Sequence, residues 1–154
     1  MSEARISTQG LAWLKQVEGL SLVPYDDQNG RRIETWVPGA TIGYGHLITK
    51  TDWPRFAGGV DADTAETLLA ADLGPFERAV SSNVQPPIAG HQFDALVILA
   101  FNIGASAFAR SSMLRLINDS SASTAYPSLE AAWKAWNKSH GKVMRGLVNR
   151  RNAE

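Results

Sequence analysis

The stretch that decides the fold runs from Glu18 to His46 and reads EGLSLVPYDDQNGRRIETWVPGATIGYGH. It begins with a carboxylate, continues through a polar loop that carries Asp26 and Asp27, and closes with a glycine-rich, β-prone run, Thr41–His46. Two acids and a hydroxyl around one cleft are the groups that acid-catalysed cleavage of a glycosidic bond requires. The stretch is therefore our candidate catalytic centre.

A helix is expected to lead into Glu18. Ser7 or Thr8 is typical of a helix N-cap, and Gly19 is typical of a helix stop. Leu14 precedes Glu18 by four positions, so the two side chains share one face of the helix. An apolar face and a helix C-terminus both disfavour a negative charge, which suits a general acid. An exposed glutamate at a fraying helix end is the ordinary alternative.

The residues after the acidic loop predict a small antiparallel sheet. Over residues 32–37, Ile33, Thr35 and Val37 alternate with Arg32, Glu34 and Trp36 in a strand pattern, between turn signals at Asn29-Gly30 and Pro38-Gly39. We expect this strand to pair with Thr41–Tyr44 across the second turn.

From Asp63 onward the pattern is helical. Asp63–Glu66 has the form of a capping box and opens a helix over about 63–81, which Gly74-Pro75 can bend. The run Gln92–Phe101 is apolar almost all round, as expected of a buried central helix. Shorter helices are predicted at about Ala105–Ala109, Ser112–Asn118, Ser128–Asn137 and Val143–Arg151.

This pattern resembles the phage-type lysozymes, the muramidases of glycoside hydrolase family 24. The family signature is present as Glu18-Gly19, Tyr25, Asp27 and Thr41–His46. The family's spacing from Glu to Asp equals the interval here, 27 − 18 = 9, which selects Asp27 over Asp26. The likeness continues at Gln92–Leu96, Ala100–Gly104, Trp133, Trp136, Gly141-Lys142, Gly146-Leu147 and Asn149–Arg151.

The resemblance implies a fold of the α+β class, mostly α. It implies a two-lobed lysozyme-like fold, with a small antiparallel β-sheet in the N-terminal lobe and a helical C-terminal lobe. Residues 1–154 are expected to form a single domain, with a small lobe at about 19–62, an interlobe helix at about 63–81, and a helical lobe at about 86–154 plus the N-terminal helix.

The resemblance also implies the site. Glu18 would be the general acid of an inverting glycoside hydrolase, Asp27 would steer the attacking water, and Thr41 would support that water. The alternatives are a turn former for Asp27 and an ordinary strand residue for Thr41. Substrate binding is expected at Tyr25, Tyr44, Asn102 and Gly104, and structural support from a His46–Asp72 pair. Asn102 and Gly104 are nearly as well explained as a helix end, and Trp133 and Trp136 are better explained as core than as a sugar platform.

One departure lies between the catalytic residues. The interval from Asp27 to Thr41 is 41 − 27 = 14, longer than in the shortest family members, and the extra residues lie within Gln28–Ala40. We expect a longer hairpin at the cleft edge, whose Arg31 and Arg32 suit carboxylates on peptide stems.

Composition excludes several other classes. The chain has no cysteine for a disulfide and no run of 18 apolar residues for a membrane span. Its three histidines lack zinc spacing, and neither a P-loop nor a nucleophile elbow is present. We expect no metal and no cofactor. The N-terminus lacks the apolar core of a signal peptide.

The net charge of +0 conceals an asymmetry. Residues 61–77 carry only acidic charges, and residues 134–151 carry only basic ones. The basic segment is either a solvated helix face or a surface for an anionic polymer, cell wall or nucleic acid.

The sequence thus predicts a peptidoglycan hydrolase that cleaves β-1,4 bonds between N-acetylmuramic acid and N-acetylglucosamine in bacterial cell-wall lysis. The alternative is a catalytically silent lysozyme-like module that binds wall polymer or a partner protein. We expect a monomer that binds peptidoglycan glycan strands, with neither nucleic-acid binding nor membrane insertion. It would be made in the bacterial host cytoplasm and act in the periplasm or on the wall after delivery by another factor. The sequence fits a phage lysin, a tail enzyme or a secreted toxin domain. The possible partners in these contexts are a holin, a secretion apparatus or an immunity protein.

Overall fold

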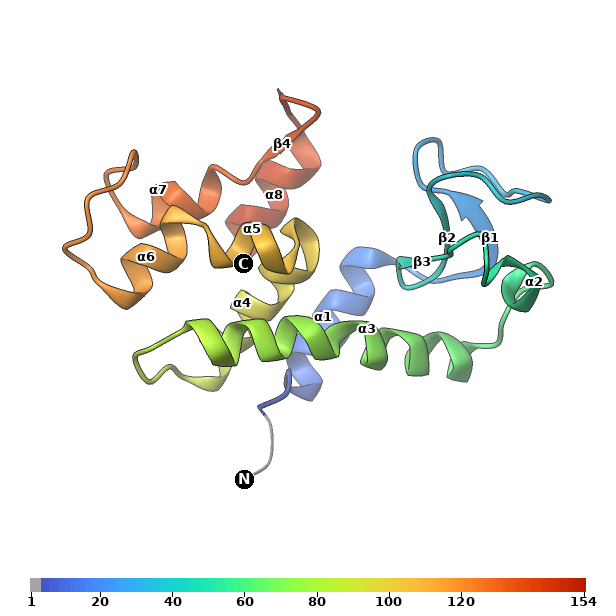
Figure 1. The fold of residues 1–154 in the computed structure, drawn as a ribbon, viewed down its shortest axis with the longest axis horizontal. Coiled ribbons are helices and arrows are strands. Elements are labelled where there is room, and N and C mark those ends of the chain that lie inside the picture. Colours follow the sequence, from blue (N-terminus) through green and yellow to red (C-terminus); the bar gives the residue numbers. More distant parts are fainter. Residues whose placement is uncertain (1–3) are drawn as a thin grey trace. The chain divides into compact units, whose positions relative to one another are not determined.

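The computed structural model describes residues 4–154, which are mostly helical with two small antiparallel sheets (Figure 1). The chain divides into two compact units. We call residues 11–74 the sheet unit, and residues 75–154 with the segment up to Gly10 the helical unit. The elements are α1 (Thr8–Glu18), β1 (Ser21–Asp26), β2 (Ala40–Gly43), β3 (His46–Leu47), α2 (Trp53–Phe56), α3 (Ala62–Asn83), α4 (Gly90–Ile103), α5 (Ala105–Ala109), α6 (Ser112–Asn118), α7 (Leu129–Lys134), β4 (Lys138–Ser139), β5 (Lys142–Val143) and α8 (Arg145–Ala153).

Helix α1 has the predicted limits. The hydroxyl oxygen of Ser7 accepts a hydrogen bond from the Gly10 backbone N–H at 3.1 Å, so Ser7 rather than Thr8 caps the helix. The helix ends at Glu18, and Gly19 follows with a φ of +73°. Its N–H donates to the carbonyl of Lys15 at 3.0 Å, a common way to close a helix.

The three-stranded sheet differs from the expected one. Strand β1 pairs with β2, and β2 pairs with β3, all antiparallel. The strand predicted over residues 32–37 is wrong, because the only β-pairing of this segment within residues 4–154 is a single bridge between Arg32 and Tyr25. The segment that pairs with β2 is instead β1, which contains Pro24 and ends at Asp26, a residue expected in a loop.

Packing explains the misleading alternation in the segment before β2. Ile33 and Trp36 pack against the small core of the sheet unit, which consists of Ala40, Ile42, Ile48, Phe56 and Leu68. The indole N–H of Trp36 also donates to the carbonyl of Ile48 at 2.9 Å. Ile33 and Trp36 thus fix a folded loop against this core and do not form one face of a strand.

Helix α3 begins slightly earlier than predicted. A side-chain oxygen of Asp61 accepts from the backbone N–H of Thr64 at 2.7 Å. The N-terminal cap is therefore Asp61, and the capping box predicted at Asp63–Glu66 is wrong. The helix continues through Pro75 to Asn83.

The helical unit is built around α4, which is almost entirely apolar as predicted. Its buried residues are Phe93, Asp94, Leu96, Val97, Ile98, Leu99 and Ala100. Helices α5 and α6 have the predicted limits. The predicted helix over Val143–Arg151 starts too early, since Val143 belongs to the hairpin β4–β5. That hairpin turns through His140 and Gly141, whose φ values of 51° and 78° suit a tight antiparallel turn.

Candidate active site

The sequence-predicted catalytic residues all lie in the sheet unit. Glu18 is the last residue of α1, Tyr25 lies in β1, Asp27 follows β1, and Thr41 lies in β2. Tyr25 and Thr41 are direct cross-strand partners in the sheet. A pocket of about 340 Å³ is lined by Glu18, Tyr25 and Arg32 among others, a size within the range of about 300–1,000 Å³ that small-ligand sites occupy.

The tyrosine reports the electrostatics of this cluster. The pKa of Tyr25 is raised above its ordinary value of 10.0, first by burial and then by the negative charges of Glu18 and Asp27. Both carboxylates therefore lie near enough to the Tyr25 hydroxyl to oppose its ionisation. We call this group, the two acids Glu18 and Asp27 together with the hydroxyl of Tyr25, the anionic centre.

Hydrogen bonding separates the two neighbouring aspartates. The Asp26 carboxylate is engaged in its own turn, where it accepts from the Gln28 backbone N–H at 2.9 Å and from the Asn29 side chain at 3.3 Å. The Asp27 carboxylate is exposed and accepts no hydrogen bond from any residue within 4–154. The turn-forming role that sequence alone allowed for Asp27 thus belongs to Asp26, and Asp27 is left accessible to a ligand.

Two glycines leave room for the acids. A Cβ atom on Gly39 would lie 2.5 Å from a carboxylate oxygen of Asp27, and one on Gly45 would lie 3.4 Å from Oε2 of Glu18. Both glycines have left-handed φ values, +97° and +83°. Sequence reasoning assigned Gly39 only to a hairpin turn. No local sequence signal marks its contact with Asp27, because the contact arises from the pairing of β1 with β2.

The loop between Asp27 and Thr41 closes at its base on one carbonyl. The Gly39 carbonyl accepts from the Asp27 backbone N–H at 3.1 Å and from the Thr41 hydroxyl at 2.9 Å. The long insertion therefore loops out without separating these two residues. Thr41 is only 4% exposed, yet its hydroxyl oxygen retains lone pairs that can accept a hydrogen bond from water.

The contact predicted between His46 and Asp72 is present. His46 Nδ1 lies 2.8 Å from Asp72 Oδ2, and the imidazole meets the ring of Phe56 edge-on at 5.5 Å. Tyr44 is half-buried, and the ammonium of Lys15 lies 5.8 Å from its ring centroid. The supporting role of the pair and the sugar-binding role of Tyr44 stay predictions.

The remaining predicted binding residues belong to the helical unit. Gly104 ends α4 with a φ of +97°, and its N–H donates to the Ala100 carbonyl at 2.8 Å. Asn102 is exposed in the last turn of the same helix. The helix-end interpretation thus describes the observed contacts of Gly104, and substrate binding by both residues stays a prediction. Trp133 is half-buried and donates its indole N–H to Glu154, as expected of a structural tryptophan.

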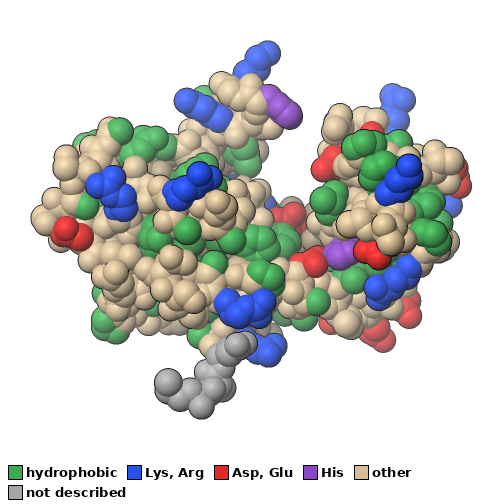
Figure 2. Space-filling view, viewed as in Figure 1, with side chains coloured by type: hydrophobic (Ala, Val, Ile, Leu, Met, Phe, Trp, Pro, Cys, Tyr) green, Lys and Arg blue, Asp and Glu red, His purple; other side chains and the backbone are tan. Residues whose placement is uncertain are grey.

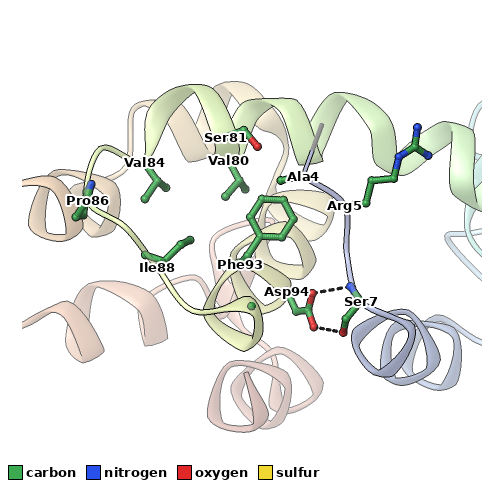
Figure 3. A pocket seen from close by; sticks show the side chains of 11 residues that line it. Ala4, Arg5, Ser7, Val80, Ser81, Val84, Pro86, Ile88, Phe93 and Asp94 are labelled. Carbon is green, nitrogen blue, oxygen red and sulfur yellow. Dashed lines mark hydrogen bonds between the residues drawn. The ribbon is translucent and has the colours of Figure 1, made fainter. Parts of the chain in front are cut away.

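A second cavity lies in the helical unit, near the N-terminal segment (Figure 3). Its walls include the apolar side chains of Val80, Val84, Ile88 and Phe93, and its buried carboxylate is Asp94. Asp94 accepts from the Ser7 backbone N–H at 2.8 Å and from the Ser7 hydroxyl. Because each carboxylate oxygen accepts a hydrogen bond from Ser7, Asp94 serves to hold the N-terminal segment in place.

The basic C-terminal segment is partly used within the fold. Lys134 pairs with Glu130, and the guanidinium groups of Arg150 and Arg151 contact Glu154. Lys, Arg and His side chains still gather around the β4–β5 turn (Figure 2). Across residues 4–154, no cluster of His, Cys, Asp and Glu is arranged to hold a metal ion, and no helix is long and apolar enough to cross a membrane.

Comparison with known proteins agrees with this geometry. Residues 15–154 match the family described as phage lysozyme. The chain belongs to the phage lysozyme family. It is 39% identical to the endolysin of Salmonella phage P22 over 97% of this chain and 94% of that protein. It is 37% identical to the endolysin of Bacillus phage PZA over 97% of this chain, but spans only about half, 53%, of that protein.

Solved structures of phage lysozyme relatives show the same fold. The muramidase domain of SpmX from Asticaccaulis excentricus is 32% identical, with a TM-score of 0.74 over 97% of this chain and 93% of that one. A P22 lysozyme mutant is 32% identical, with a TM-score of 0.71 over 97% of this chain and 94% of that one. The mostly helical, lysozyme-like α+β fold predicted from the sequence is thus confirmed.

Proposed function

We propose that this phage lysozyme is a muramidase that hydrolyses the β-1,4 bonds between N-acetylmuramic acid and N-acetylglucosamine in peptidoglycan. The observation that carries the proposal is the anionic centre in the sheet unit, where Glu18 and Asp27 lie close enough to the half-buried Tyr25 hydroxyl for their charges to raise its pKa. A glycosidase needs two carboxyl groups with different roles. Glu18 ends α1 and lines the pocket, whereas Asp27 follows β1 and is exposed, and these different surroundings support such a division.

In the proposed reaction Glu18 is the general acid. It transfers its proton to the glycosidic oxygen as the bond between that oxygen and the anomeric carbon breaks. A water molecule attacks the opposite face of the sugar, and its oxygen forms the new bond to the anomeric carbon. Asp27 orients this water and accepts its proton, while Thr41 accepts a hydrogen bond from it. The product then has the inverted anomeric configuration.

The remaining assignments belong to the same proposal. Tyr25, Tyr44, Asn102 and Gly104 would contact the glycan, and the His46–Asp72 pair would hold β3 against α3. The two units would act as one monomeric domain. The protein would reach the periplasm or the wall through another factor, for which a holin, a secretion apparatus and an immunity protein are the candidate partners.

Digestion of purified peptidoglycan tests the activity. Mass analysis of the fragments and identification of the new reducing ends should show N-acetylmuramic acid at every new end. Proton NMR during the first minutes of hydrolysis should show the inverted anomer before mutarotation equilibrates the two. Reducing N-acetylglucosamine would contradict the bond assignment, and retained configuration would contradict the role of Asp27. Sedimentation with cell walls without new reducing ends would favour the silent binding module.

A further inference from the structure

Arg32 shares a pocket with the proposed general acid. The pocket that contains Glu18 and Tyr25 is also lined by Gly30 and Arg32, both from the insertion that separates Asp27 from Thr41. Arg32 is the one cationic residue among the residues that line this pocket, all of which fall within the described part of the chain. The neighbouring Arg31 is exposed and is not among them. The structure therefore separates two arginines that the sequence presents as equivalent.

The backbone of Arg32 is held in place from both sides. Arg32 forms a β-bridge with Tyr25, and the carbonyl of Arg31 accepts from the Asp26 N–H at 2.9 Å. On the other side, the Ile33 N–H donates to the Pro24 carbonyl at 3.1 Å. The insertion is thus fastened to β1 at Arg32, and the Cα of this residue has a defined position beside Tyr25.

The guanidinium group, by contrast, is lightly engaged. Arg32 Nε lies 3.5 Å from a carboxylate oxygen of Glu34, and the two side chains are 65% and 84% exposed. An exposed ion pair of this kind contributes little free energy, so a ligand can compete for the guanidinium. A fixed backbone with an available planar donor group suits bidentate recognition of a carboxylate.

The charge of the site calls for such a cation. Glu18 and Arg32 line the same pocket, and Arg32 is the group among its lining residues that attracts an anionic ligand. Peptidoglycan carries carboxylates on its peptide stems, and removal of a stem frees the carboxylate on the lactyl ether of the muramyl sugar. Resting on the muramidase function proposed above, we propose that Arg32 binds a substrate carboxylate at this site and so determines selection of muramyl glycan over uncharged glycan.

The test compares Arg32→Gln with Arg31→Gln, which removes the same charge from the adjacent position. Three substrates separate the sources of the carboxylate: intact peptidoglycan, glycan strands freed of peptide stems by an amidase, and chitin oligomers, which have no carboxylate. Arg32→Gln should raise KM about tenfold on a carboxylate-bearing substrate, with kcat within about twofold. A loss on intact peptidoglycan alone assigns a stem carboxylate, a loss on amidase-treated strands alone assigns the lactyl carboxylate that the amidase frees, and a loss on both shows that Arg32 binds either one.

Binding measured in a Glu18→Gln background keeps this test independent of turnover. Affinity for amidase-treated strands and for chitin oligomers is compared with and without Arg32→Gln, and Arg32→Lys should recover only part of the loss because it lacks the planar fork. Failure of the unmutated protein to hydrolyse any wall polymer would overturn the proposed function. Equal affinities for Arg32→Gln and Arg31→Gln on every substrate, or an equal loss on chitin oligomers, would overturn the role of Arg32.

Discussion

The two units use the same chemical group, a carboxylate, in opposite ways. In the helical unit Glu77 and Asp94 are 7% and 9% exposed, and each accepts a backbone N–H of the N-terminal segment, from Ile6 at 2.7 Å and from Ser7 at 2.8 Å. In the sheet unit Asp27 is exposed and accepts no hydrogen bond within residues 4–154.

This contrast distinguishes structural acids from candidate catalytic ones. A carboxylate whose oxygens accept protein N–H and O–H groups is held in place by them, and fewer of its lone pairs remain for a water molecule or a substrate. Asp26 and Asp27 show the same distinction at adjacent positions, since Asp26 serves the turn and Asp27 does not. If hydrogen bonding separates structural acids from catalytic ones, replacement of Asp27 should impair turnover and replacement of Asp26 should not.

The largest effect is expected at Glu18. Glu18→Gln removes the transferable proton and should lower kcat by about 10²–10⁴-fold or more. The melting temperature should change little. A matched control is Glu66→Gln, which removes an exposed carboxylate paired with Lys15 in the same unit. The comparison breaks if the Glu18 variant retains near-normal turnover, or if both variants lose activity equally.

The next effect separates Asp27 from Asp26. Asp27→Asn should lower kcat by about 10²-fold, because the attacking water loses the group that orients it and takes its proton. Asp26→Asn should leave kcat nearly unchanged, because its carboxylate only closes the turn with Gln28 and Asn29. Initial rates on peptidoglycan at matched protein concentration decide between them. The reverse order would move the catalytic position by one residue.

A smaller effect, on stability rather than on rate, is expected at Asp94. Asp94→Ala strands the Ser7 backbone N–H and should lower the free energy of unfolding by about 1–3 kcal/mol. Asp94→Asn should cost less, since an amide oxygen can still accept one of the two hydrogen bonds. Urea denaturation gives the stabilities, and kcat of the folded variants should match the unmodified protein. A variant with unchanged stability and impaired kcat would show that this acid has been misclassified.

Much of the helical framework follows from the sequence, because its signals are local. The helix stop at Gly19 and the apolar run of α4 needed no knowledge of the rest of the chain. The small sheet was harder to predict, since Ile33 and Trp36 would lie on opposite faces of a strand, yet both pack against the same core in the folded loop. Pro24 made β1 hard to predict as a strand, since proline is uncommon within strands.

The site follows the same rule. The spacing of Glu18 and Asp27 and the family likeness were enough to name both residues. The contact of Gly39 with Asp27 and the place of Arg32 in the pocket depend on how β1 pairs across the insertion. No local motif encodes such long-range pairing, so the contact of Gly39 and the difference between Arg32 and Arg31 could be identified only from the three-dimensional structure.

The smallest expected effect concerns the pH dependence of stability and sharpens the description of the anionic centre. Burial and the charges of Glu18 and Asp27 raise the pKa of Tyr25, so the folded protein holds the phenolic proton more tightly than the unfolded chain. The stability contributed by this proton is complete below the unfolded pKa of about 10 and is lost as pH rises through the higher folded value.

Replacement of Tyr25 by phenylalanine removes the titrating group. The difference in free energy of unfolding between the tyrosine protein and Tyr25→Phe should therefore be constant below about pH 9 and should shift against the tyrosine protein at more alkaline pH. Adding Asp27→Asn to both proteins should reduce this shift, because one of the repelling charges is gone. A difference that stays flat to pH 11 would mean that Tyr25 does not sense the two acids, and the anionic centre would have to be redrawn.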